Sequence, residues 1–424
     1  MNPGLAIGGG LWSGQTPKIP LIAAAALVAF GAAPWGTWHL DDYSFQSGLP
    51  WMVRPLSWLT FRMNGSEPWM FLAVNLALHV VNAILVYKLL DRLAPALIFA
   101  VHPLCAEPVN YIFARPTLLA ALFSLLCGID WKRGHPWRAC AWLALALASK
   151  EDALAVPLVI LLFDRRFSKP VLAMFASRPL AAMFTMCAAA GAWSLYATAS
   201  IAGSGAGAQA GIGAFEYLHA QGAAMLRYLA KFFIPTRLTL DPPLLIDHGW
   251  LGWWVVLLYA ATIRNRFAWA ALLLLLPSSS IVPLADLAAD RRMYLSVAAL
   301  AASLPNWSVW AVPVLAVLSI FQTQVWRTEE SLWRHVERLS AHKLRPTIQL
   351  SRSVSPLECL TILEAAEKKW PEEASVPAEM GRCALQAGAP ALALQYFGRA
   401  LALDPANESA KANRDAAIRA LTER

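Results

Sequence analysis

The chain has 424 residues, of which 58% are hydrophobic and 15% are charged. A soluble domain would contain about 45–50% apolar and about 25% charged residues, so this composition excludes an ordinary soluble protein and predicts a membrane protein. The formal net charge is +8, but no run of Lys and Arg has the form of a stripe that follows a phosphate backbone. We therefore expect no nucleic-acid partner and assign the positive charge to loops at a membrane surface.

Eleven apolar segments predict helices that cross a membrane, for which roughly 20 residues are needed. In chain order they cover residues 19–36, 69–90, 94–103, 118–129, 138–149, 153–164, 179–198, 249–263, 267–283, 292–304 and 307–323. The first segment is expected to be a retained helix rather than a cleaved signal peptide, because many further spans follow it. The predicted fold is therefore all-α and polytopic, with about eleven transmembrane helices.

The charged residues between these segments predict the orientation of the chain. Short basic clusters belong in the cytoplasm under the positive-inside rule: Lys88 and Arg92; Lys132, Arg133 and Arg138; Arg165, Arg166 and Lys169; Arg264 and Arg266. The opposite helix ends carry acids and bases together: Asp41, Asp42, Arg54, Arg62, Glu107, Arg115, Lys150, Glu151, Asp152, Arg227, Asp241, Asp290, Arg291 and Arg292. Charged groups near membrane depth line aqueous cavities or pair with one another, so we expect one polar chamber at the outer face.

The tail is different in composition. Residues 324–424 contain 14 Lys and Arg and 13 Asp and Glu, against 21 and 14 in residues 1–323, which predicts a water-soluble domain after the membrane domain. A repeat spacing of 34 residues places Gly381, Gly388, Ala393, Phe397, Ala400 and Pro405 at tetratricopeptide positions. An odd number of crossings sends this tail out of the cytoplasm. There Cys359 and Cys383 either form a disulfide or remain free thiols.

Short segments in order along the chain carry a family resemblance. They are DD at 41–42, NLALH at 75–79, FAVHPLCAEPV at 99–109, SKE at 149–151, LTLD at 238–241, DRRMYL at 290–295 and WRTEESLW at 326–333. These segments resemble the multi-spanning, tetratricopeptide-containing O-mannosyltransferases and their bacterial relatives, within the GT-C superfamily. The resemblance implies a GT-C-like catalytic domain at 1–323, and residues 324–424 are expected to form a periplasmic linker and tetratricopeptide-like helical domain. A bacterial inner membrane is expected because the chain is compact.

The same resemblance implies an inverting glycosyltransferase that moves a hexosyl or pentosyl group. The expected donor is a polyprenyl-phosphate-linked sugar, the expected acceptor is a protein hydroxyl, and the tail is expected to hold the acceptor or a partner. No Gly-rich loop for a nucleotide phosphate is present. A divalent cation remains a candidate cofactor, with its ligands unknown.

Three acids are the candidate catalytic residues. A general base must accept the proton of the attacking hydroxyl, and the resemblance assigns this role to Asp41 or Asp42; the alternative is a solvated Asp-Asp turn. Glu107 lies between Pro103 and Pro108, which break the helix, and broken helices at membrane depth line cavities. Glu107 is expected to orient the acceptor or sugar, or to help the acid pair hold the cation.

The candidate substrate-binding residues are His39, His102, Arg115, Lys150, Glu151, Arg291, Arg292 and Tyr294. A departing phosphate needs Arg or Lys at the lipid–water boundary, and Arg292 is the first choice because it matches the arginine of the family. Structural alternatives stay open: His102 as a structural hydrogen-bonding group, Lys150 paired with Glu151 or Asp152, and Arg291 or Arg292 paired with Asp286 or Asp290. Arg54, Arg62, Arg227 and Lys231 are interpreted as interfacial anchors.

Two other classes of protein compete with this interpretation. A transporter or lipid flippase would also contain charges at membrane depth, but the charges here gather on one face and no inverted repeat is evident. A membrane scaffold with a partner-binding tail would need only one anchoring helix.

Overall fold

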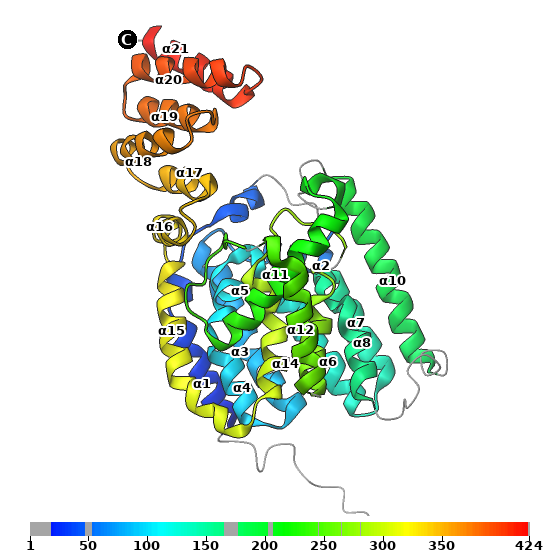
Figure 1. Ribbon diagram of the computed structural model, residues 1–424. Helices are drawn as coiled ribbons and strands as arrows, with labels where there is room; N and C mark the ends of the chain where they lie inside the picture. Colours follow the sequence, from blue (N-terminus) through cyan, green and yellow to red (C-terminus); the bar gives the residue numbers. More distant parts are fainter. Residues whose placement is uncertain are drawn as a thin grey trace, which may run out of the picture. The chain divides into compact units, whose positions relative to one another are not determined.

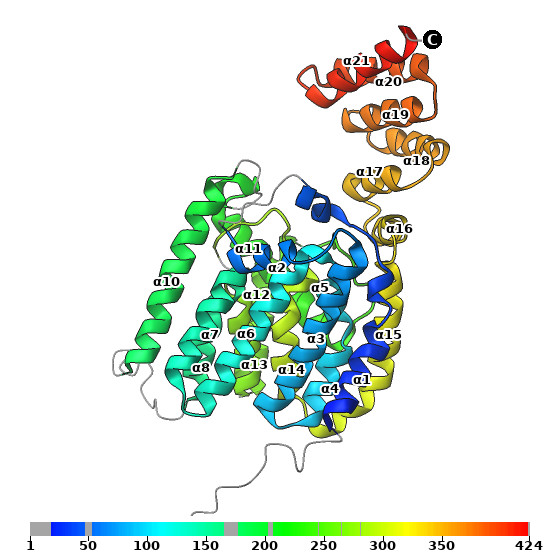
Figure 2. The same ribbon diagram turned by 180° about the vertical axis from the view of Figure 1, so that it is seen from behind.

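The computed structural model describes residues 18–46, 53–164, 177–201, 207–244, 246–263, 265–279 and 281–422. Every regular element among these residues is a helix, which confirms the all-α prediction (Figures 1 and 2). Contacts divide the chain into two compact units, one formed by Met1–Leu238 and Leu244–Arg327 and the other by Thr239–Pro243 and Thr328–Arg424. The predicted cytoplasmic residues Arg165, Arg166, Lys169 and Arg264 lie outside the described residues.

The first unit contains long apolar helices joined by shorter turns. Its α-helices are α1 (Lys18–Phe30), α2 (Pro55–Arg62), α3 (Pro68–Leu90), α4 (Leu93–Val101), α5 (Ala106–Asn110), α6 (Arg115–Lys132), α7 (Pro136–Ser149), α8 (Val156–Phe163), α10 (Arg178–Ala199), α11 (Ala214–Phe233), α12 (Gly249–Ile263), α13 (Arg266–Leu275), α14 (Tyr294–Ser303) and α15 (Val312–Val325). Short 3₁₀ helices connect them at η1 (Ala33–Trp35), η2 (Leu40–Gln46), η3 (Pro103–Cys105), η4 (Ile112–Ala114), η5 (Glu151–Ala155), η6 (Gly207–Ala210), η7 (Ile246–His248), η8 (Asp290–Met293) and η9 (Asn306–Ala311).

Five helical stretches of the described chain are long and apolar enough to cross a membrane. They are Lys18–Trp35, Pro68–Leu90, Ile112–Lys132, Arg178–Ala199 and Asn306–Val325. A further candidate is the pair Leu93–Val101 and Pro103–Asn110, which bends by 55°, where Pro103 cannot donate a helical hydrogen bond. The protein is therefore an integral membrane protein, and the total of eleven crossings stays a prediction.

At one end of this unit, basic side chains donate hydrogen bonds to backbone carbonyls of neighbouring helix ends. Lys132 Nζ donates to the Leu89 carbonyl at 2.8 Å, and the Arg92 guanidinium donates to the carbonyls of Ala302 at 2.6 Å and Leu304 at 2.8 Å. The α3–α4, α6–α7 and α14–η9 connections therefore share this end. Helix α6 begins next to η4 and ends at this end of the unit, and α7 leads back from this end to η5. Because η5 also contacts α6, η4 and η5 lie together at the opposite end of the unit.

Two predicted features of this unit need correction. The predicted helix 267–283 ends at Leu275, because Pro277 removes a backbone donor and disfavours a helical conformation in the residue before it. None of the predicted segments covers residues 214–233, where the structure has α11. This helix packs against α12 through glycines: a Cβ added to Gly222 would lie 1.8 Å from the Gly249 carbonyl oxygen, so only glycine permits this approach.

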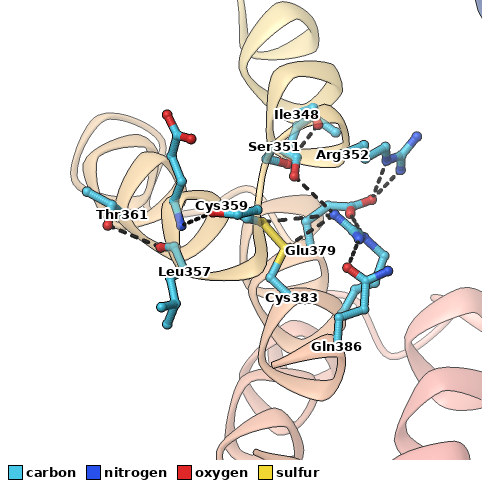
Figure 3. The surroundings of a disulfide bond; sticks show 12 residues. Ile348, Ser351, Arg352, Leu357, Cys359, Thr361, Glu379, Cys383 and Gln386 are labelled. Carbon is cyan, nitrogen blue, oxygen red and sulfur yellow. Dashed lines mark hydrogen bonds and ion pairs between the residues drawn. A yellow bond between two sulfur atoms is a disulfide. The ribbon is translucent and has the colours of Figure 1, made fainter. Parts of the chain in front are cut away.

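The second unit is a series of short amphipathic helices. They are α16 (Glu329–Leu339), α17 (Leu344–Ser353), α18 (Pro356–Lys369), α19 (Ser375–Gln386), α20 (Pro390–Leu403) and α21 (Glu408–Thr422), and each contacts the next in the chain. Gly381 on α19 faces the ring of Phe397 on α20, where a Cβ would lie 2.5 Å from a ring carbon. Cys359 and Cys383 form a disulfide between α18 and α19 (Figure 3).

Candidate active site

The acid pair lies in η2, and its two carboxylates have different surroundings. Asp42 is only 1% exposed. Its Oδ2 accepts the backbone N–H of His39 at 2.9 Å, and its Oδ1 accepts the backbone N–H of Phe113 at 2.8 Å. Burial raises the pKa of Asp42 to about 8, although these backbone donors act in the opposite direction. Asp42 is therefore a largely neutral group at pH 7 that attaches η2 to η4.

Asp41 is the accessible member of the pair. Its side chain is exposed, and the Tyr111 hydroxyl donates to its Oδ2 at 3.0 Å. The Tyr111 ring stacks on Trp326, with centroids 5.7 Å apart and an angle of 28° between planes. The hydroxyl is thus held by a packed ring and fixes one oxygen of Asp41. Of the two acids, Asp41 is the one that an incoming substrate can reach.

His39, which precedes the acid pair, is fully buried. Its Nε2 lies 2.8 Å from the Trp326 carbonyl, which only accepts, so Nε2 carries the proton. Burial lowers the pKa of His39 to about 4, which keeps the ring neutral at pH 7. Its buried Nδ1 has no hydrogen-bond partner within the described residues. These contacts favour a role in fixing the backbone before η2.

Glu107 and Arg291 form a second charged group. Glu107, on α5, is 5% exposed, and its Oε1 lies 2.5 Å from Arg291 Nη1. Its Oε2 accepts the backbone N–H of Arg291 at 2.9 Å, and Arg291 Nη2 also lies 3.4 Å from Asp286. Burial lowers the pKa of Arg291, but the charges of Glu107, Tyr111 and Asp286 outweigh it and raise this pKa above the ordinary value. Arg291 is therefore near both Glu107 and the Tyr111 that contacts Asp41.

A third group forms at η5. The Arg54 guanidinium binds Glu151 through Nη2 at 2.6 Å and Nε at 3.2 Å, and Lys150 Nζ contacts Asp152 at 2.6 Å. Burial opposes ionisation of Glu151, but the charge of Arg54 outweighs it and lowers the pKa of Glu151 to about 2. Arg291 acts electrostatically on Arg54, which places the second and third groups near each other. These groups and the acid pair make up the acid–base cluster.

Two candidate substrate-binding residues, His102 in the bent segment and Arg115 at the start of α6, are buried and bonded to other parts of the protein. His102 is 1% exposed; its Nδ1 accepts the Leu104 N–H at 3.2 Å, and its Nε2 lies 3.0 Å from the Phe232 carbonyl. Arg115 is 0% exposed and donates to the side chains of Asn75 and Asn64 and the carbonyls of Thr60 and Phe71. The contacts favour the structural alternative for His102 and give Arg115 a packing role.

Two further candidates lie around the start of α14. Arg292 donates to the carbonyl oxygens of Leu287 at 3.2 Å and Asp286 at 2.5 Å. Tyr294 is fully buried, with its hydroxyl 2.8 Å from His79 Nδ1 and 3.2 Å from Asn82 Nδ2. Arg292 therefore fixes the loop before η8, and Tyr294 fixes α14 against α3. These hydrogen bonds go to backbone carbonyls of the preceding loop and to buried side chains of α3.

Several residues of this region were missed or interpreted differently in the sequence analysis. Tyr111 was not considered, although it follows the predicted FAVHPLCAEPV segment closely. Arg54 and Arg227 were interpreted as interfacial anchors, but Arg54 binds Glu151, and Arg227 forms a buried pair with Asp290 at 2.5 Å. Such long-range partners have no sequence pattern, because the pairing depends on helix packing.

The structure gives no ligand set for the candidate divalent cation. Within the described residues, no group of three or more His, Cys, Asp or Glu side chains is arranged to hold a metal ion. The cation therefore remains an expectation from the sequence, with no residue assigned to it.

The first unit has several helices long enough to cross a membrane, and the acid–base cluster lies at one end of them. The class of protein is therefore a multi-spanning membrane protein. Curated relatives confirm the resemblance found in the sequence. Protein O-mannosyl-transferase TMTC1 of Homo sapiens is 33% identical over 112 residues, covering 23% of this chain and 12% of that protein. Protein O-mannosyl-transferase TMTC3 of Homo sapiens is 30% identical over 125 residues, covering 27% and 13%.

Protein O-mannosyl-transferase tmtc2 of Xenopus laevis is 32% identical over 154 residues, covering 31% of this chain and 18% of that protein. The matched part is thus less than a fifth of the length of each of these relatives. No protein-family model matches the chain, and no solved structure matches it significantly.

Proposed function

We propose that the protein is an integral-membrane glycosyltransferase that moves a hexosyl or pentosyl group from a polyprenyl-phosphate donor to a hydroxyl of an acceptor protein. Relatives named protein O-mannosyl-transferases support the reaction class. The observation that carries the proposal is the division of the acid pair, with Asp41 exposed beside the Tyr111 hydroxyl and Asp42 buried. One accessible carboxylate, in a cluster that also contains Arg291 and Arg54, suits proton removal from the acceptor and charge stabilisation on the donor.

Asp41 is the general base of the proposed reaction. Its carboxylate accepts the proton of the acceptor hydroxyl as that oxygen attacks the anomeric carbon of the sugar. The new bond forms on the face opposite the phosphate, so the configuration at this carbon inverts. The bond between the anomeric carbon and the phosphate oxygen breaks, and its electron pair leaves with the polyprenyl phosphate.

Asp42 and Tyr111 position the base. The Tyr111 hydroxyl donates to Oδ2 of Asp41 at 3.0 Å, which orients the exposed carboxylate that takes the proton of the acceptor. A pKa of about 8 keeps most of Asp42 neutral at pH 7, so the neighbouring acid adds little negative charge to the base. Two adjacent carboxylates would repel each other if both were ionised.

Arg291 and Arg54 supply positive charge for the departing phosphate. Their side chains are 24% and 29% exposed, so each guanidinium is partly open to a ligand, and charge pairing is strong where water is scarce. We propose Arg291 in place of Arg292, whose guanidinium donates to the carbonyls of Leu287 and Asp286. Glu107 acts by holding Arg291, and Lys150 and Glu151 complete the charged surroundings.

We propose that the cluster faces the periplasm of a bacterium whose inner membrane contains the first unit. The basic connections at the opposite end of the helices support this orientation under the positive-inside rule. The disulfide between Cys359 and Cys383 supports an oxidising compartment for the second unit. In this proposal residues 1–323 are the catalytic domain and residues 324–424 are a tetratricopeptide-like domain that holds the acceptor protein.

The proposal is tested with the purified protein in lipid vesicles. Envelope proteins from cells lacking the gene serve as acceptors, and synthetic polyprenyl-phosphate sugars serve as donors. We expect sugar to appear on protein with these donors and not with nucleotide sugars, and Asp41→Asn to lower the rate at least about 100-fold, the scale of general-base catalysis. Transfer at the wild-type rate by Asp41→Asn would remove Asp41 from catalysis, and transfer from nucleotide sugars alone would refute the donor class.

A further inference from the structure

The second unit contains a polar pocket that the proposed reaction does not use. It has a volume of about 340 Å³ and is lined by Arg352, Ala378, Glu379, Arg382, Ser409 and Asn413. These residues lie on α17, α19 and α21, which alternate with α18 and α20 along the chain. Because α19 contacts both α17 and α21, the three helices form one continuous face, and the pocket is on it.

Two arginines share one carboxylate in this pocket. Glu379 Oε1 accepts hydrogen bonds from Arg352, and Glu379 Oε2 accepts one from Arg382 Nε at 2.6 Å; Figure 3 shows Arg352 beside Glu379. Burial opposes ionisation of Glu379, but the two arginines outweigh it and lower the pKa of Glu379 below its ordinary value. Two positive charges therefore face one negative charge, and one positive charge remains for a ligand.

The pocket also contains hydrogen-bond donors that are not in use. Arg352 is half exposed, with 49% of its side chain accessible, and its Nη1 makes no hydrogen bond within the described part of the chain. The side chains of Ser409 and Asn413 also have no hydrogen-bond partner among the described residues. A guanidinium N–H, an amide and a hydroxyl around an excess positive charge form a donor set for a carboxylate, since charge-assisted bonds of this kind are strong.

Arg382 is a positioning residue of the pocket. Its Nη1 donates to Gln386 at 2.7 Å and its Nη2 to the Ser351 carbonyl at 3.3 Å. The same Nη2 lies 3.2 Å from the sulfur of Cys383, which is disulfide-bonded to Cys359. The covalent link between α18 and α19 thus lies directly beside the arginine. A pocket fixed in this way loses less conformational freedom when it binds a ligand.

We propose that this pocket binds a carboxylate group of a polypeptide, through Arg352, Asn413 and Ser409. A volume of about 340 Å³ is near the lower limit of the roughly 300–1,000 Å³ of small-molecule sites, which suits one acidic side chain or a chain terminus. The inference rests on the proposed role of the second unit in holding the acceptor, and it names an acidic segment as the feature recognised there. Acceptors with a carboxylate at the right distance from their glycosylated hydroxyl would be preferred.

The test uses the full-length protein in detergent micelles and three fluorescent peptides of Gly and Ser. The first has three internal Glu residues and an amidated end, the second has Gln in place of Glu, and the third is neutral with a free terminal carboxylate. Fluorescence anisotropy measures their affinities. We expect the protein to bind the first or third peptide and not the second. A preference between the two binders identifies the source of the carboxylate.

Arg352→Gln should weaken the affinity for the bound peptide at least about 10-fold, the scale of a lost charge-assisted hydrogen bond, and Asn413→Ala should weaken it further. The matched control is Arg399→Gln, which removes an arginine outside the pocket that pairs with Glu367 and should leave the affinity unchanged. Equal losses in Arg352→Gln and Arg399→Gln, or equal binding of all three peptides, would overturn the inference.

Peptide binding requires no sugar transfer, so it also separates this inference from the proposed function. Asp41→Asn should bind the peptide with wild-type affinity while losing transfer. Arg352→Gln should raise the KM for an acidic acceptor about 10-fold, in line with its affinity loss, with kcat unchanged. If Asp41→Asn loses transfer but Arg352→Gln changes neither affinity nor KM, the pocket assignment fails and the enzyme assignment stands.

Discussion

The carboxylate of Glu107 holds Arg291 twice, through the guanidinium Nη1 at 2.5 Å and through the backbone N–H at 2.9 Å. The two residues are 184 positions apart in the sequence. Glu107 lies on α5, after the bend of the chain, and Arg291 lies in η8 before α14. The contact therefore joins two interruptions of the helices, and it fixes an arginine that is near both Glu107 and Tyr111.

Glu107→Gln tests how much the Glu107–Arg291 pair contributes to the free energy of unfolding. The amide cannot balance the charge of Arg291, and breaking a fully buried pair costs about 3–5 kcal/mol. Because 24% of the Arg291 side chain is exposed, we expect a smaller loss, about 2 kcal/mol, in the free energy of unfolding measured in micelles. Glu330→Gln is the control, since its pair with Arg334 is exposed and should cost under about 1 kcal/mol. Equal losses in the two variants would show that the Glu107–Arg291 pair stabilises the protein no more than an exposed surface pair does.

Asp42 gives the stability of the first unit a pH dependence. Burial raises the pKa of Asp42 from 3.8 to about 8, so between these values the folded protein binds more protons at this site than the unfolded chain does. The contribution of neutral Asp42 is fully present below about pH 4 and is lost as the pH rises to about 8.

Thermal unfolding at several pH values checks this prediction. The Tm of the wild-type protein should fall between about pH 5 and pH 8. The Tm of Asp42→Asn should fall less, because the amide stays neutral. Parallel curves for the two proteins would contradict the assignment of the pH dependence to Asp42.

Arg115→Lys separates a packing role from a substrate-binding role for this arginine. Lysine keeps the charge but cannot reproduce the planar set of bonds to Asn75, Asn64, Thr60 and Phe71. We expect a loss of about 2–4 kcal/mol in unfolding free energy, as for other broken buried networks, with transfer per folded molecule near the wild-type value. A large loss of transfer at unchanged stability would instead support the sequence prediction that Arg115 binds the donor.

The sequence predicts the long apolar helices closely, because their composition alone determines where they lie. The predicted segment 69–90 corresponds to α3 (Pro68–Leu90) and the segment 179–198 to α10 (Arg178–Ala199). The amphipathic α11 (Ala214–Phe233) is not among the predicted segments, because its charged residues interrupt the apolar run that predicts a membrane span. The structure shows that one of them, Arg227, is neutralised by Asp290 at 2.5 Å, a pairing that no local pattern indicates.

The candidate site was predictable at the level of segments but not of individual roles. The motifs that carry the family resemblance contain Asp41, Glu107 and Arg291, so the sequence predicts all three as site residues. The sequence could not distinguish Asp41 from Asp42, since burial of one member depends on the backbone donors of His39 and Phe113. The roles proposed for these residues remain predictions for the variants to test.

The most direct test of the central claim compares intact masses of cell-envelope proteins. Four strains are needed: one with the wild-type gene, one without it, one with Asp41→Asn and one with Glu216→Gln, an exposed acid of α11 outside the acid–base cluster. We predict that one protein loses a sugar-sized mass both without the gene and with Asp41→Asn, and keeps it with Glu216→Gln. Unchanged masses in a well-expressed Asp41→Asn strain would contradict the catalytic role of Asp41 and favour a scaffold or transporter.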